Sequence, residues 1–136
     1  MDGAGYSGNP LPKKLGIRCG TRLAVVNAPQ ELPAWLGPLP EGVVHHAAPQ
    51  ADSTLVHLFV TRRADLQAQL RALRALLAPD AALWVSWPKK ASRVPSEVTE
   101  DLIRELALPL GWVDVKVCAV SAVWSGLKLV VRQALR

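Results

Sequence analysis

Short apolar runs, separated by glycine, proline and polar residues, recur along most of the chain. The run at 54–60, TLVHLFV, is almost uniformly apolar and contains β-branched residues. This pattern is typical of a strand that is covered on both faces of a sheet. Five other runs have the length and the flanking breakers of strands. The predicted strands are 23–26, 42–46, 54–60, 81–87, 112–120 and 127–132.

Three segments between these strands have a helical pattern. An apolar stripe of leucines follows the third strand and predicts an amphipathic helix that Thr61 caps. Residues 97–108 carry a second stripe, and Ser96 is the predicted cap of that helix. A shorter helix is predicted at 30–36, because a Gly-Pro pair follows it.

The order of these elements predicts the fold class. Apolar strands alternating with helices indicate an α/β fold, a mixed sheet of about six strands with helices on both faces. The last two strands have no helix between them, so they should pair as an antiparallel C-terminal hairpin. Residues 1–18 are rich in glycine and proline, and we expect no regular structure there. The chain is therefore divided into an N-terminal segment, 1–18, and a single α/β domain, 19–136.

Composition places the chain among globular proteins. It has 136 residues, of which 50% are hydrophobic and 20% are charged, which suits one domain. Cys19 and Cys118 form no CxxC pair and have no zinc-ligand spacing, so we expect free thiols and no metal site. No stretch reads as a signal peptide or a membrane span, and free thiols suit a reducing compartment. These features predict a cytoplasmic protein.

The net charge of +5 raises the question of a nucleic-acid partner. Binding to nucleic acid requires the basic side chains to share one face of the molecule. A charge of this size is also common on proteins that only need to be soluble. The residues that would carry a basic surface are Lys13, Lys14, Arg62, Lys89, Lys90 and Arg93.

Polar and basic residues follow four of the predicted strands. The carboxyl ends of parallel strands meet at one edge of a sheet, and ligands bind there in open α/β folds. Positive charge and an indole at this edge suit an anionic ligand such as a phosphate or a nucleotide. The simpler alternative is that strand ends are polar because they meet solvent. The candidate ligand-binding residues are Asn27, His45, His46, Arg62, Trp87, Lys89 and Lys90.

The N-terminal segment is a second candidate. Tyr6 lies between glycines, and Lys13 and Lys14 lie just before the predicted domain. Such a segment can form a flap across the strand ends or dock a protein partner. The alternative is a solvated tail with ordinary lysines.

An enzyme acting on an anionic small molecule is another alternative. Lys89 or Lys90 would act as a base or nucleophile together with His45 or His46. The two histidines are adjacent and point to opposite faces of a strand, so they are poorly placed to share a metal. A pair of solvated loop lysines is the simpler interpretation.

The order of elements resembles the second half of a class I S-adenosylmethionine-dependent methyltransferase domain. Residues 77–84, LAPDAALW, resemble the “pdG-x-l-w” strand of that class, and 111–131 take the place of its closing hairpin. The resemblance covers about residues 20–133 in outline, and it implies a Rossmann-like fold with the strand order 2-1-3-4-6-5.

Two cofactor-binding features of that class are missing. Its members have a glycine-rich turn directly after the first strand, whereas this chain has Asn27, Ala28 and Pro29 there. Their second strand usually ends in an acidic residue for the ribose hydroxyls, whereas this one ends in His45 and His46. The resemblance therefore implies a fold without a bound cofactor, and an active methyltransferase is not expected.

A second resemblance extends over nearly the whole chain, from Gly5 to Arg132. It is to a family of short bacterial proteins known as domain of unknown function 3052. That family has no established activity and supplies no catalytic residues. The leading hypothesis is a small non-catalytic module that binds a protein partner or an anionic ligand at the strand ends. The matching segments are GYSG at 5–8, PKKLGI at 12–17, VNAP at 26–29, WPKK at 87–90 and WSGLK at 124–128.

Overall fold

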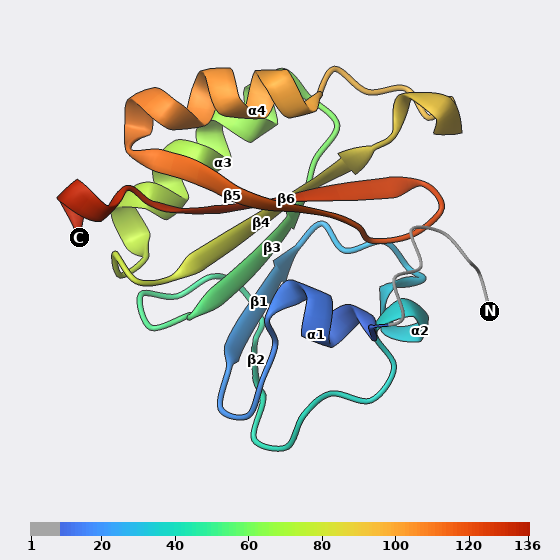
Figure 1. Ribbon diagram of the computed structural model, residues 1–136, viewed down its shortest axis with the longest axis vertical. Coiled ribbons are helices and arrows are strands. Elements are labelled where there is room, and N and C mark those ends of the chain that lie inside the picture. Colours follow the sequence, from blue (N-terminus) through green and yellow to red (C-terminus); the bar gives the residue numbers. More distant parts are fainter. Residues whose placement is uncertain (1–8) are drawn as a thin grey trace.

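The protein is built on a mixed six-stranded sheet, seen in a computed structural model that describes residues 9–136 (Figure 1). The strand order is β2-β1-β3-β4-β6-β5, so the predicted fold class and strand order are confirmed. The strands are β1 (Arg22–Val26), β2 (Val44–His46), β3 (Leu55–Phe59), β4 (Ala82–Pro88), β5 (Trp112–Ala119) and β6 (Trp124–Val131).

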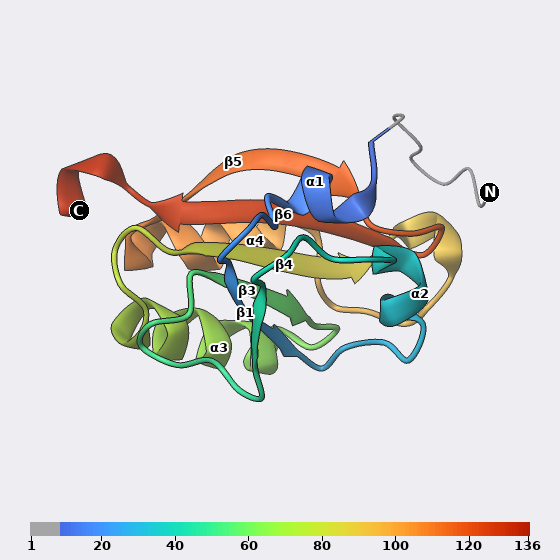
Figure 2. The ribbon, with the colours of Figure 1, turned by 90° about the horizontal axis from the view of Figure 1, so that it is seen from below.

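The first four strands are parallel, and the last two form the predicted antiparallel hairpin. β1 pairs in parallel with β2 and β3, and β3 pairs in parallel with β4. β6 runs antiparallel between β4 and β5. All five residues of β3 are buried, as expected for a strand covered on both faces. As a result, β1, β3 and β4 end at the same edge of the sheet (Figure 2).

Helices α3 (Arg63–Leu76) and α4 (Glu100–Ala107) cover one face of the sheet (Figure 1). The buried leucines of α3 and the buried side of α4 join one apolar cluster with β3, β4 and β6. Burial of such side chains stabilises a fold by about 25 cal/mol per Å² of apolar surface. This layer carries the amphipathic stripes that the sequence predicts.

Helices α1 (Leu11–Leu15) and α2 (Leu32–Leu36) cover the other face. The expectation of no regular structure before residue 19 is wrong for α1. Pro12 lies in the first turn, where its missing amide costs no helical hydrogen bond. Leu11 and Leu15 are one helical turn apart and both are buried, so α1 packs as part of the fold.

Two helix starts differ from the sequence prediction. α3 begins without a side-chain cap; instead, the backbone amide of Arg63 donates to Glu97 Oε1 at 2.9 Å. α4 begins at Glu100, where Thr99 Oγ1 accepts from the amide of Leu102 at 3.1 Å. In both helices a side chain does accept a hydrogen bond from an amide at the helix start, but it belongs to a different residue from the predicted one.

Cys19 and Cys118 are both free thiols.

Within residues 9–136, no helix combines the length and the apolar character that crossing a bilayer requires.

Candidate functional site

A hollow lies beside the carboxyl end of β4, on the side of the sheet that α4 covers. It has a volume of about 580 Å³. We call it the rim hollow. Its polar and aromatic lining includes Trp87, Lys89, Lys90, Arg93, Ser96 and Thr99.

Tight turns after β4 place the three cations of the rim hollow. Pro88 is the last residue of β4, and the Lys89 amide donates to the carbonyl of Val123 at 2.7 Å. Ser92 Oγ then donates back to the carbonyl of Lys89 at 2.6 Å and closes the short 3-10 helix η1 (Lys90–Ser92). Arg93 follows in a left-handed conformation with φ of 62°. Such a backbone is uncommon outside glycine and often occurs at functional positions.

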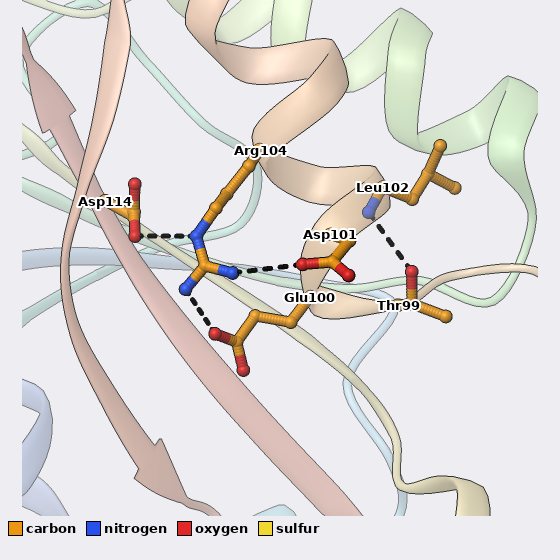
Figure 3. Close-up of polar contacts among 6 residues, drawn as sticks. All are labelled: Thr99, Glu100, Asp101, Leu102, Arg104 and Asp114. Atoms are coloured by element: carbon orange, nitrogen blue, oxygen red, sulfur yellow. Dashed lines mark hydrogen bonds and ion pairs between the residues drawn. The ribbon is translucent and has the colours of Figure 1, made fainter.

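The first turn of α4 forms the opposite wall and is fixed by an ion-pair network (Figure 3). Arg104 Nε donates to Asp114 Oδ2 of β5 at 2.9 Å, and its other nitrogens contact Glu100 and Asp101. The Asp114 and Glu100 hydrogen bonds raise the pKa of Arg104, and Arg104 lowers the pKa of Asp114. This network ties α4 to β5, and Thr99, the cap residue of α4, lines the hollow.

The charge of the rim hollow is positive. Lys89, Lys90 and Arg93 form no ion pair within the part of the chain that the structure describes. Glu100 also lines the hollow, but its carboxylate is paired with Arg104. An anion entering the hollow therefore meets three unpaired cations and one neutralised acid.

Trp87 forms part of the wall and part of the core. It is 8% exposed and packs in the cluster beneath α3 and α4. Its ring therefore offers an apolar contact surface at the hollow and is held rigidly for that contact.

The other residues predicted at the strand ends do not join this hollow. Asn27 Nδ2 donates to the carbonyl of Phe59 at 3.4 Å, and Arg62 is exposed just before α3. His45 lines a different cavity, under α2. His46 turns back to Ser53, with Nδ1 2.7 Å from its Oγ. Of the predicted set, the structure groups only Trp87, Lys89 and Lys90.

Two of the three flap residues, Lys13 and Lys14, also lie elsewhere. Tyr6 falls outside the described residues. Lys13 lines an open hollow of about 650 Å³ between α1 and the loop at 38–40. Lys14 Nζ donates to the carbonyl of Ala119 at 3.0 Å. The basic residues proposed for nucleic acid are therefore split, because α1 and the rim hollow lie on opposite faces of the sheet.

Several residues of the rim hollow were missing from the set predicted for the strand ends, among them Arg93, Ser96 and Thr99. Arg93 was assigned only to a basic surface, and Ser96 only to a helix cap. Thr99 was not singled out. All three residues lie between β4 and α4, and that position could have indicated them. Loops at the carboxyl edge of a parallel sheet commonly hold ligands.

The residues at the end of β1 can be compared with what S-adenosylmethionine would need for binding there. Asn27 has a φ of 58°, so the turn after β1 contains a residue in the left-handed conformation. This residue is an asparagine, and its side chain occupies the space that a glycine would leave open beside the backbone. The adjacent cavity of about 260 Å³ is lined by apolar residues from β1 and α2, and His45 is the one polar side chain. The cofactor has charged amino, carboxylate and sulfonium groups and ribose hydroxyls, which need polar partners. The residues at this cavity do not fit it.

The contact between His57 and Ser86 is part of the core. His57 Nε2 and Ser86 Oγ are 2.7 Å apart, but both side chains are buried in the sheet, where no substrate reaches them. Among residues 9–136, no group of three His, Cys, Asp or Glu side chains is placed to hold a metal ion.

Comparison with known proteins identifies the fold and no family. No family model matches the chain, and no curated protein matches it. The solved structures that are similar include a putative type 11 methyltransferase from Sulfolobus solfataricus, at 10% identity and a TM-score of 0.61, covering 90% of each chain. TrmN from Thermus thermophilus is similar at 14% identity and a TM-score of 0.56, with 89% of this chain covered.

A third similar structure is fibrillarin from Aeropyrum pernix, which was solved with natively bound S-adenosyl-L-methionine. It matches at 12% identity and a TM-score of 0.56, over 93% of this chain and 70% of the fibrillarin chain. The chain spans 47% of the length of TrmN. At these identities the similarity establishes a methyltransferase-like, Rossmann-like α/β fold.

Proposed function

We propose that this protein is a small non-catalytic binding module that holds an anionic small molecule in the rim hollow. The observation that carries the proposal is the gathering of Lys89, Lys90 and Arg93, all without ion-pair partners in residues 9–136, around one hollow beside Trp87. Cations bind phosphate and carboxylate groups through charge-assisted hydrogen bonds, and an indole adds contact with a ring. A nucleotide-like ligand suits both interactions, because its phosphate can bind the cations and its aromatic base can contact the indole.

Two observations favour binding over catalysis. The cavity at the end of β1 does not fit S-adenosylmethionine, which the similar fibrillarin structure holds. The lysines and histidines of the enzyme hypothesis line separate cavities or face other residues, so they cannot act on one substrate together.

Membership of the family called domain of unknown function 3052 is part of this proposal. It rests on the segments from Gly5 to Arg132 that resemble that family. All four residues of one of these segments, WPKK at 87–90, line the rim hollow, which links the resemblance to the site.

Calorimetric titration with AMP and adenosine tests the function. AMP should bind and adenosine should bind much more weakly, because only AMP carries a phosphate. The double variant Lys89→Gln/Lys90→Gln should lose about tenfold or more in AMP affinity, since charge-assisted hydrogen bonds contribute about 1.5–3 kcal/mol each. Arg71→Gln, an exposed change on α3, is the matched control and should leave binding unchanged. Equal binding of AMP by all three proteins contradicts the assignment.

A further inference from the structure

Lys128 lies in a second hollow, at the opposite end of the sheet from the rim hollow. This cavity of about 370 Å³ is bounded by the loop after α1, by the turn before β4 and by β6. We call it the lysine hollow. Leu15, Leu55 and Ala82 give it apolar walls, whereas Arg18, Asp80 and Lys128 are its charged residues. The Lys128 ammonium lies over Gly16, 3.9 Å from the position that a Cβ would take there.

Lys128 is surrounded mostly by positive charge. Lys116 of β5 is its direct cross-strand partner, and like charges in that position repel. Arg18 approaches from the loop after α1. Lys14 on α1 and the Cys118 thiol lie near Lys116, and Asp80 is the one carboxylate that lines the hollow. Lys128 itself makes no hydrogen bond and no ion pair with any residue in 9–136.

These surroundings disfavour the charged ammonium relative to that of a lysine in solvent. Lys128 is partly buried, and burial lowers its pKa first, with the charges of Lys116 and Arg18 lowering it further. A neutral lysine is a nucleophile toward carbonyl carbon, and desolvation beside another cation is a known way to produce one. Arg18 is placed to bind an anionic group on the same molecule.

We propose that Lys128 is a reactive amine that forms an imine with a small anionic aldehyde or ketone, whose anionic group is bound by Arg18. The amine nitrogen adds to the carbonyl carbon and a C=N bond replaces the C=O bond. The carbonyl oxygen leaves as water, with both protons supplied by the amine. No electrons are transferred, so the step needs no oxidant or reductant. Asp80 is the one carboxylate that lines the same hollow.

Trapping with pyridoxal 5′-phosphate tests this site. The full-length protein is incubated with the aldehyde near pH 7.5, reduced with borohydride, digested and mapped for modified lysines. Lys128 should be labelled first, and pyridoxal, which lacks the phosphate, should label it more slowly. Arg18→Gln should remove the difference between the two aldehydes. Lys116→Gln should slow the labelling of Lys128, because it removes a neighbouring charge that lowers the Lys128 pKa.

Two controls keep this test separate from the rim hollow. Lys128→Met should lose the label at position 128 and keep the slow labelling of other lysines. Lys89→Gln/Lys90→Gln should label Lys128 at the normal rate, whether or not the rim hollow binds anions. Labelling in order of exposure, with Lys13, Lys90 and Lys116 ahead of Lys128, overturns the proposal. Equal rates with pyridoxal and its phosphate also overturn it.

Discussion

His57 shows what burial does to a single titratable residue. It is 2% exposed in the middle of β3, stacks on Phe59 with ring centroids 4.2 Å apart, and has Nε2 2.7 Å from Ser86 Oγ. Desolvation lowers its pKa from 6.5 to about 3. The folded protein therefore keeps this imidazole neutral under conditions where the unfolded chain protonates it.

The pH dependence of stability should report this residue. Below pH 6.5 the unfolded state binds a proton that folded His57 does not accept until about pH 3, so stability falls as the pH falls. Between pH 6.5 and pH 5 the loss should be about 2 kcal/mol. Urea unfolding at the two pH values measures it. His57→Gln keeps an amide near the Nε2 position but does not titrate, so its stability should change less over that range. The same loss in both proteins contradicts the assignment.

At the residue scale, the sequence indicates the burial of His57 but not the surroundings of Lys128. The TLVHLFV run predicts a strand covered on both faces, and His57 lies within it. Lys128 alternates with apolar residues along β6 and therefore reads as solvent-facing. Its surroundings depend on Lys116 and Arg18, which reach it only through strand pairing and the position of α1.

At the element scale, α4 depends on its cap as well as on its apolar side. Thr99→Ala removes the acceptor of the Leu102 amide and should lower the free energy of unfolding by about 1 kcal/mol. Thr99→Ser keeps a hydroxyl there and should lose much less. Chemical denaturation of the three proteins checks this. Equal losses in the two variants would mean that the methyl group, and not the hydrogen bond, is what matters.

The elements themselves follow from local pattern where that pattern is strong. The strands and the two long helices are predicted because apolar residues repeat at strand or helix spacing. α1 was missed because nearby glycines and prolines outweighed a spacing of only one turn between Leu11 and Leu15. The cap of α4 was misplaced because Ser96 and Thr99 are both capable residues, and the packing of α4 against β5 decides between them.

At the scale of the whole molecule, α1 should be part of one cooperative unit. Leu15 is 1% exposed, and its carbonyl accepts from Trp84 Nε1 at 2.8 Å. Leu15→Ala should cost about 2–5 kcal/mol, as truncation of a buried leucine does. Lys13→Ala, an exposed change on the same helix, should cost almost nothing. Unfolding followed by circular dichroism and by tryptophan fluorescence should coincide. A negligible cost for Leu15→Ala would place the helix outside the cooperative domain.

The candidate site could be located from sequence only as an edge of the sheet. The carboxyl ends of parallel strands identify that edge, and Trp87, Lys89 and Lys90 lie there as expected. Which strand-end residues share a cavity depends on the face that each one points to, and a shift of one residue reverses that face. His45 lies within β2 and Asn27 follows β1, and neither strand is next to β4 in the sheet, so both residues fall outside the rim hollow.

Native mass spectrometry of gently purified protein tests the central claim most directly. If the rim hollow holds an anionic small molecule, the wild-type protein should carry a small mass in excess of the chain. Lys89→Gln/Lys90→Gln should lose this mass, and Arg71→Gln/Arg132→Gln, which removes the same number of charges at exposed positions outside both hollows, should keep it. A bare mass for the wild-type protein, or an excess that the rim variant retains, would contradict a ligand site at the rim hollow.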